Sequence, residues 1–148
     1  MALFESFGIS ASGMAANRFW SDLIANNVAN INSSGTPGDP ANQPYRRQVP
    51  VFNEILRQQT GARQKSTVQA PGKGVQVSQL VHVDSEPTLI YDPGHPDADP
   101  QTGYVAYPNI NILNEMVNLI SATRAYQSNV TVLEAAKSMA VAALDMGR

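Results

Sequence analysis

Apolar residues near the start of the chain recur at helical spacing. From about Phe7 to Ile31 they fall three, four or seven positions apart with no proline among them: Ile9, Ala16, Trp20, Leu23, Ile24 and Ile31. This spacing places them on one face of a helix. The pattern stops at residues 32–40, where glycines and prolines remove helical dihedral preference and backbone donors. The sequence therefore predicts an N-terminal helix followed by a long loop.

A longer helix is predicted at the other end of the chain. It opens near Pro108 and Asn109 and runs without another proline to Gly147. At 1.5 Å per residue its length is roughly 55 Å. Two interleaved seven-residue series run along it: Met116, Thr123, Val130, Lys137 and Leu144, and Leu119, Tyr126, Leu133, Ala140 and Gly147. Such a heptad repeat is typical of a coiled-coil seam.

The middle of the chain, residues 44–108, carries strand and turn signals. Gln48–Phe52 reads as a short strand, which Pro50 restricts to a sheet edge. Thr88–Tyr91 is another extended segment, closed by the proline- and glycine-rich turn Asp92–Pro96. Between them, valines alternate along one predicted strand face at Val75, Val77, Val81 and Val83.

We therefore predict an α+β chain in which two long terminal helices pack as an antiparallel coiled coil, with a small, irregular β-rich region between them. The expected parts are an N-terminal helix in residues 1–34, an inserted β-rich region in 35–107 and a C-terminal helix in 108–148. A middle region of weak strands cannot cover so long a helix, so the first helix is its nearest partner. Phe19, Val132 and Met139 lie off the predicted seams and imply contacts with neighbouring copies.

Composition narrows the class of protein. Only 15% of the 148 residues are charged, against about 25% in ordinary soluble domains. There is no cysteine, which excludes disulfides and thiolate sites. No apolar run approaches the roughly 20 residues of a membrane span, and the N-terminus lacks the basic and apolar regions of a cleaved signal peptide. We expect neither membrane insertion nor export by the general secretory route.

Charge is unevenly distributed along the middle of the chain. Residues 41–80 hold one acidic side chain, Glu54, and six basic ones: Arg46, Arg47, Arg57, Arg63, Lys65 and Lys73. Residues 81–115 hold no basic side chain and six acidic ones: Asp84, Glu86, Asp92, Asp97, Asp99 and Glu115. Two readings stay open, namely two solvated loops or oppositely charged patches that meet between subunits.

Several segments carry a family resemblance beyond these patterns. Ile24–Asn30 resembles the asparagine-rich signature near the N-terminus of flagellar rod, hook and hook–filament junction proteins. Further segments look specifically like the FlgC family of flagellar basal-body rod proteins: Pro44–Gln48, Tyr91–Asp99, Gly103–Val105 with Pro108 and Asn109, Glu115–Val117, Ile120–Tyr126 and Ala135–Lys137. The resemblance covers nearly the whole chain. It departs from the family pattern only locally, at Phe19–Trp20 and at Gly38–Gln43.

The resemblance implies a structural function without a cofactor. Such a chain would be a subunit of the proximal rod, the helical drive shaft that transmits torque from the membrane ring towards the distal rod and hook. Its partners would be copies of itself, other rod proteins and an adaptor at the base of the rod in the membrane ring. The flagellar type III apparatus would export it to the periplasmic rod without cleavage. Another rod or hook-junction subunit is the alternative within the superfamily.

Candidate assembly residues come from the helices and from the basic pair in the middle of the chain: Trp20, Leu23, Asn26, Asn27, Asn30, Arg46, Arg47, Met116, Leu119, Tyr126, Val130 and Leu133. For the three asparagines, two interpretations remain open. They cap the end of the first helix, or some of them face the coiled-coil seam, where a buried amide fixes register. The arginine pair suits a subunit contact to carboxylates or a solvated edge better than a nucleic-acid groove, given the net charge of -2.

One constellation offers an alternative from another class of function. Asp92, His95, Asp97 and Asp99 could hold a divalent cation, which would suit a small metal-dependent hydrolase. The prolines in this loop and a spacing that fits no calcium or zinc template favour a structural loop instead. We therefore expect no enzymatic activity, no metal and no catalytic residue.

Overall fold

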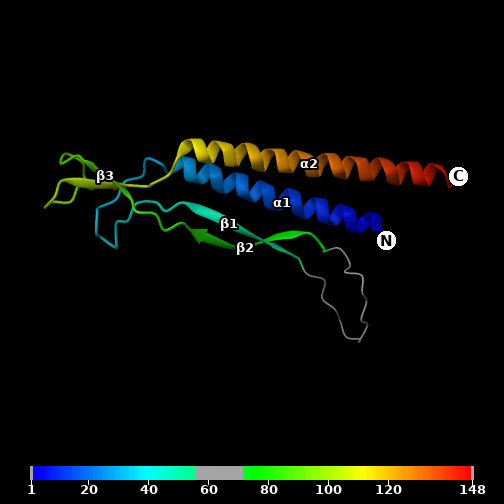
Figure 1. The fold of residues 1–148 in the computed structure, drawn as a ribbon, viewed down its shortest axis with the longest axis horizontal. Helices are drawn as coiled ribbons and strands as arrows, with labels where there is room; N and C mark the ends of the chain where they lie inside the picture. Colours follow the sequence, from blue (N-terminus) through cyan, green and yellow to red (C-terminus); the bar gives the residue numbers. More distant parts are fainter. Residues whose placement is uncertain (1, 56–71, 148) are drawn as a thin grey trace, which may run out of the picture.

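Two long helices lie side by side in opposite directions in the computed structural model, which describes residues 2–55 and 72–147 (Figure 1). α1 spans Ala2–Ala29 and α2 spans Ile112–Asp145. Both chain ends therefore lie at the same end of the molecule (Figure 1). α1 begins five residues earlier than predicted, because the residues before Phe7 contain neither proline nor glycine to stop a helix.

The start of α2 is fixed by a side-chain cap rather than by the predicted Pro108–Asn109 pair. Asn111 adopts an extended conformation, and its side chain accepts hydrogen bonds from the backbone N–H groups of Leu113 and Asn114, at 2.9 and 3.3 Å. These are two of the donors that the first turn of a helix cannot satisfy itself. The helix therefore starts at Ile112, three residues after the predicted start at Asn109.

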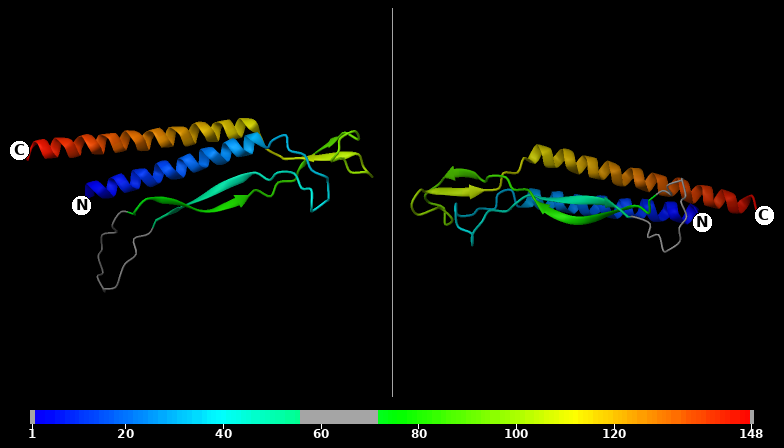
Figure 2. Two further views of the ribbon diagram at one scale, coloured as in Figure 1. Left: turned by 180° about the vertical axis from the view of Figure 1, so that it is seen from behind. Right: turned by 60° about the horizontal axis from the view of Figure 1, so that its bottom comes forward.

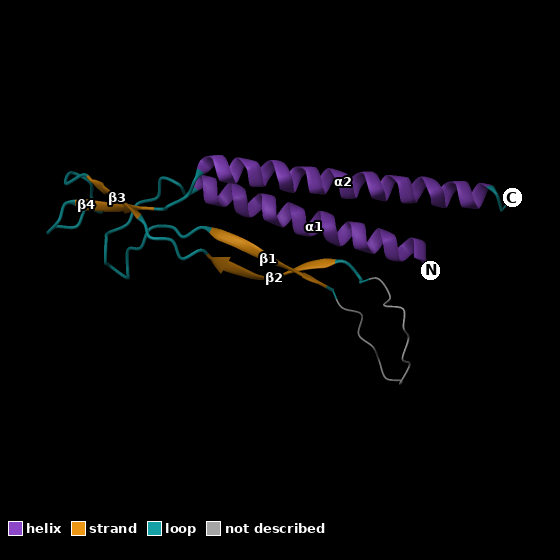
Figure 3. Cartoon of the chain, viewed as in Figure 1, coloured by secondary structure: helices purple, strands orange, loops and turns teal. Residues whose placement is uncertain are grey.

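The middle region forms two separate antiparallel hairpins (Figure 3). β1 (Gln48–Glu54) pairs with β2 (Val75–His82), and β3 (Thr88–Tyr91) pairs with β4 (Tyr104–Tyr107). The α+β class, with a small β region between two long terminal helices, is confirmed. β4 was not predicted as a strand, although Val105 and Ala106 within it are fully buried.

The β1–β2 hairpin lies along the side of α1 that faces away from α2, whereas the β3–β4 hairpin extends beyond the far end of the helix pair (Figure 2). Trp20 of α1 contacts Phe52 of β1 edge to face, with ring centroids 5.9 Å apart. The register of the hairpin shifts between Val51 and Phe52. Because this bulge breaks the alternation, Val77 is half-buried while Val81 is 38% exposed, and the single valine face that was predicted does not form.

The seam between the helices is built from smaller residues than the heptads predicted. On α2 the buried positions are Glu115, Ala122 and Ala136, seven residues apart or twice that. They lie one position before the predicted series of Met116, which is 54% exposed, and Leu144, which is 74% exposed. The prediction was wrong here because it assigned the bulky apolar side chains to the inside. α1 buries its own set against α2 and the hairpin: Ser10, Gly13, Ala16, Leu23, Ile24 and Asn27.

Gly13 shows how closely the two helices approach. A Cβ atom at this position would lie 2.9 Å from Oδ1 of Asn129 on α2. The Asn129 side chain is held in turn by a 2.9 Å hydrogen bond from its Nδ2 to the carbonyl oxygen of Ala125. A Cβ atom at Gly8, in the same helix, would meet no neighbouring side chain within 4 Å. The close fit of the Asn129 side chain against α1 therefore requires a residue without a Cβ atom at position 13, whereas position 8 has no such neighbour.

We predict that Gly13→Leu destabilises the helix pair by about 1–3 kcal/mol, because a larger side chain must push α1 and α2 apart. Gly8→Leu is the matched control, and it should be neutral or stabilising by up to about 1 kcal/mol through helix propensity. Thermal unfolding followed by far-ultraviolet circular dichroism measures both. Equal melting temperatures for the two variants would contradict this account of the seam.

Candidate functional site

A buried carboxylate lies where both helices meet the first hairpin. Glu115 is in the first turn of α2 and is 1% exposed. Its backbone N–H donates to the carbonyl oxygen of Asn111, which starts the helical hydrogen-bond pattern. A negative side chain at this position interacts favourably with the positive end of the helix dipole. That interaction alone does not offset the loss of water around a buried charge, so the carboxylate needs partners.

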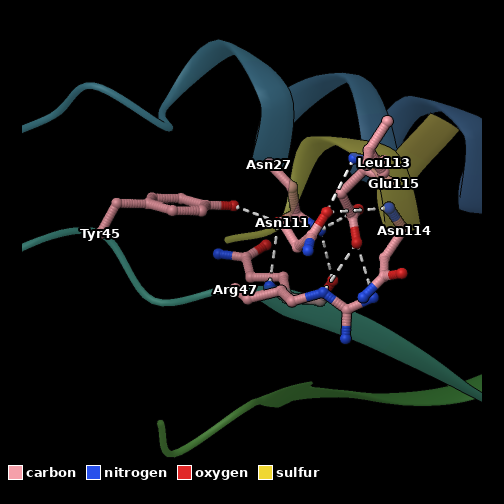
Figure 4. Close-up of polar contacts among 8 residues, drawn as sticks. Asn27, Tyr45, Arg47, Asn111, Leu113, Asn114 and Glu115 are labelled. Carbon is pink, nitrogen blue, oxygen red and sulfur yellow. Dashed lines mark hydrogen bonds and ion pairs between the residues drawn. The ribbon is translucent and has the colours of Figure 1, made fainter. Parts of the chain in front are cut away.

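Arg47, just before β1, supplies the main partner of Glu115. Its Nη2 and Nε lie 2.6 and 2.8 Å from Oε1 of the carboxylate (Figure 4). The arginine side chain is 27% exposed, so solvent reaches part of the guanidinium group while the carboxylate stays dry. A charge-assisted hydrogen bond from Nε together with an ion pair at this distance is among the stronger contacts available to a protein.

Asn27 connects the same carboxylate to α1 and to the backbone of β1. Its Nδ2 donates to Oε2 of Glu115 at 3.1 Å and to the carbonyl oxygen of Gln48 at 2.9 Å. Its Oδ1 accepts from the backbone N–H of Gln48 at 3.0 Å and from the Tyr45 hydroxyl at 2.9 Å. Asn27 is itself 1% exposed. One amide thus joins α1, α2 and β1, and all four of its interactions are made within the chain.

Tyr45 closes the cluster on the side of the loop. Its hydroxyl donates to Asn27 and accepts from Nδ2 of Asn26 at 3.4 Å. Burial, followed by the negative charge of Glu115, raises the pKa of Tyr45. Both causes favour the neutral phenol that the hydrogen bond to Asn27 requires. Every buried side-chain nitrogen and oxygen in the described parts of the chain has a hydrogen-bond partner.

We call Asn27, Tyr45, Arg47, Gln48 and Glu115 the polar junction. The sequence predicted Asn27 and Arg47 as interface residues but not their partners. Glu115 is 88 positions from Asn27 and 68 from Arg47, and nothing local to a lone glutamate signals such a contact. Of the two interpretations of the asparagines, Asn27 follows the buried-amide one. Asn30 instead donates to the carbonyl oxygen of Asn26 at 2.8 Å near the helix end.

The basic pair also has partners within the chain. Arg47 contacts Glu115, and Nη1 of Arg46 lies 3.3 Å from Oδ1 of Asp84. The Arg46–Asp84 pair is exposed, with side chains that are 51% and 90% accessible. At these two positions the opposite charges of the middle region pair within one subunit, and not between subunits as one of the two readings predicted. Arg57, Arg63 and Lys65 lie outside the described residues.

The remaining interface candidates divide by exposure. Leu23 is buried, and Trp20, Val130 and Leu133 are half-buried. On α2, Met116, Leu119 and Tyr126 are 54%, 40% and 39% exposed. Other large apolar side chains of this helix are also exposed: Ile112, Leu113, Val117, Ile120, Val132, Met139, Val141 and Leu144. So much uncovered apolar surface on one helix is unusual for a monomeric protein and typical of an interaction face.

The acidic loop uses its own carboxylates as structural acceptors. Asp97 accepts from the Ser34 hydroxyl at 2.5 Å and from Nδ2 of Asn42 at 3.0 Å. These bonds, that of Ser34 first, lower the pKa of Asp97. Nδ1 of His95 accepts from the backbone N–H of Asp97, so this imidazole nitrogen is occupied as well.

Asp99 serves the same loop. It accepts from the Thr102 hydroxyl, which lowers the pKa of this carboxyl, and from the backbone N–H of Gln101. Across residues 2–55 and 72–147, no group of three or more metal-ligating side chains comes together. The Asp97 and Asp99 carboxylates are thus engaged in hydrogen bonds within the loop.

A hollow of about 430 Å³ lies beside the polar junction, between residues 36–47 and 84–87. Five prolines contribute to its walls: Pro37, Pro40, Pro44, Pro87 and Pro108. Its lining also includes Tyr45 and Arg47 of the polar junction.

Comparison with known proteins gives a consistent family. Residues 101–146 match the model of the flagellar basal body rod FlgEFG protein C-terminal family. The chain is 37% identical to the flagellar basal-body rod protein FlgC of Bacillus subtilis, with both sequences covered completely. It is 39% identical to FlgC of Borreliella burgdorferi over 97% of each chain, and 38% identical to FlgC of Salmonella typhimurium over all of both. No helix in the described residues has the length and hydrophobicity of a membrane span.

We predict that Arg47→Ala destabilises the chain by about 3–5 kcal/mol, because it leaves the buried Glu115 carboxylate without its counter-charge. Arg46→Ala is the matched control. It removes the neighbouring arginine from an exposed ion pair and should cost about 0–1 kcal/mol. Urea unfolding of the purified variants measures both. Similar losses for the two arginines would show that the junction carries no special weight.

Proposed function

Because the chain belongs to the FlgC family of flagellar basal-body rod proteins, we propose that it is a structural subunit of the proximal rod and that its work is packing rather than catalysis. The proposal rests on the 37–39% identity to FlgC proteins over 97–100% of the chain. In this function the paired helices form an inner helical wall, and the two hairpins make contacts on its outside. A shaft that transmits torque must be stiff, and repeated contacts between identical subunits provide that stiffness.

The apolar surface of α2 supports this function physically. The helix pair is held by small residues and one polar junction, so its large apolar side chains remain available for neighbouring subunits. Burying such side chains contributes about 1.5–3 kcal/mol each. Each of these side chains that an assembly removes from water therefore adds a contribution of that size to the contact between subunits. The interface candidates Met116, Leu119 and Tyr126 belong to this surface.

Partners and route follow from the same family membership. The subunit associates with copies of itself and with other rod proteins, and at the base of the rod with an adaptor in the membrane ring. It reaches the periplasmic rod through the flagellar type III apparatus without a cleaved signal peptide. Locating the chain in purified basal bodies by immunoelectron microscopy tests the assignment. A basal body that lacks this chain while the cells swim normally would contradict it.

We predict that Met139→Asp abolishes swimming while leaving the isolated chain folded. Met139 is 62% exposed, so a charge there meets water in the monomer but apolar surface in the rod. Ser138→Asp is the matched control, because it places the same charge on an exposed polar position of the same turn and should preserve motility. Leu133 is less suitable, since it is half-buried and a charge there also disturbs the helix seam.

Cells that carry only each variant are scored for swimming, and circular dichroism checks that the purified chains are folded. Normal swimming with Met139→Asp would remove the exposed face of α2 from the assembly account.

A further inference from the structure

The outer edge of β1 is closed at its start. The backbone N–H of Val83 donates to the carbonyl oxygen of Arg47, so these two residues form a hydrogen-bonded pair of the ladder. Hydrogen-bonded pairs alternate in an antiparallel ladder, so the backbone groups of Gln48 and Pro50 point away from β2. Asn27 satisfies both groups of Gln48, and Pro50 has no N–H and is buried. No further strand can pair here.

The outer edge of β2 is open over the same stretch. His82 pairs with Gln48 and Leu80 pairs with Pro50. By the same alternation, the backbone N–H and C=O groups of His82 and Leu80 point away from β1, towards the outer edge of β2. Nothing in the described residues bonds to the backbone N–H or C=O of either residue. The side chains around them are also exposed, with Leu80 at 45% and Val81 at 38%. Unpaired backbone groups in a row are the template on which another strand adds.

β3 offers a second open edge of matching length. The backbone N–H of Asp92 donates to the carbonyl oxygen of Gly103, which fixes the alternation of hydrogen bonds in this hairpin. The backbone N–H and C=O groups of Leu89 and Tyr91 therefore point away from β4. Ala106, the partner of Leu89, agrees with this, because its N–H and C=O both bond to Gly35 on the far side of β4. Leu89 and Tyr91 are 53% and 64% exposed.

We propose that β3 of one subunit adds to the open edge of β2 of a neighbouring copy. Each edge presents two residues, two positions apart, with free donors and acceptors. One antiparallel register pairs all of them, with Leu80 opposite Tyr91 and His82 opposite Leu89, and forms four hydrogen bonds. Strand order in the joined sheet is then β1–β2 of the first copy followed by β3–β4 of the second.

The two edges differ from each other, so the contact is heterologous. One copy donates β3 while its own β2 accepts, and repetition of such a contact produces an open helical series rather than a closed dimer. The inference thus rests on the proposed rod function, in which copies follow one another around a shaft. Four hydrogen bonds are weak by themselves, so the pairing forms in the rod, where the helices supply most of the binding energy, and not in dilute monomers.

Disulfide trapping in assembled rods tests the register, and the absence of native cysteine leaves no background. Cells express two variants together, one carrying His82→Cys and the other Leu89→Cys. Opposed residues in such a ladder have Cα atoms about 5.5 Å apart, within the range that a disulfide spans. We expect a crosslinked dimer of the two variants in basal bodies and none in the dilute purified mixture. The matched control replaces Leu89→Cys by Ile90→Cys, whose side chain points to the other face of the strand and should give little product.

Several outcomes would overturn the proposal. Equal crosslinking of the in-register and off-register pairs would do so. A homodimer formed by Val81→Cys alone would do so too, because it would mean that two β2 edges pair symmetrically. Rods that contain the chain but give no crosslink above the control would reject the strand addition and leave the rod assignment standing. Absence of the unmodified chain from basal bodies would reject both.

A proline substitution gives a second measure. Leu80→Pro removes an outward N–H and leaves the ladder to β1 intact, whereas Val81→Pro removes an N–H that bonds to β1. We expect Leu80→Pro to keep the circular dichroism spectrum of the unmodified chain and to lose swimming, while Val81→Pro changes both. Normal swimming with Leu80→Pro would overturn the proposal independently of the crosslinks.

Discussion

The burial of one carboxylate determines how the parts of this chain are joined. Glu115 lies in the first turn of α2 and is 1% exposed, and a charge there is tolerated only when each oxygen has a partner. Arg47 and Asn27 provide those partners, one from the approach to β1 and the other from α1. The loop after α1 must therefore return so that β1 starts beside the helix pair. The course of the first hairpin along α1 follows from that return.

In the rest of the structure, less of the large apolar surface is buried inside the subunit than is exposed on α2. Inside, small residues such as Gly13, Ala122 and Ala136 let the helices approach closely but bury little apolar area. Outside, α2 exposes residues that an ordinary globular protein would bury. A subunit made in this way is held together by its polar junction and by close packing, and under the proposed rod function the larger hydrophobic contribution comes from assembly. The same division leaves two strand edges open, which a monomer gains nothing from and an ordered polymer can use.

Periodicity and turn chemistry predicted much of this fold. Both helices and three of the four strands lie where apolar spacing and proline placed them, because those signals are local. The sequence did not predict β4, because Tyr104–Tyr107 is short and becomes recognisable as a strand only through its pairing with β3. The inner seam was predicted one position out of phase, because bulky residues at seven-residue spacing look alike whether they face a partner helix or a neighbouring subunit.

The polar junction was beyond sequence reasoning for a different reason. Asn27, Arg47 and Glu115 are individually unremarkable, and their meeting depends on the antiparallel return of α2 and on the path of residues 30–47. Asn27 was predicted as a helix cap or a buried amide of the seam, and Arg47 as a subunit contact or a solvated edge, but Glu115 was not predicted as a partner of either residue. Long-range polar contacts have no period and no local signature, so a single sequence indicates the residues without indicating what they contact.

A double-mutant cycle on Asn27 and Arg47 tests most directly whether the junction acts as one unit. Both side chains serve the Glu115 carboxylate, on different oxygens, so Asn27→Ala and Arg47→Ala should not be independent. The account predicts that the loss of unfolding free energy in the double variant differs from the sum of the single losses by about 1 kcal/mol or more. Additivity within about 0.5 kcal/mol would mean that the two contacts are separate and that the buried carboxylate does not join the hairpin to the helices.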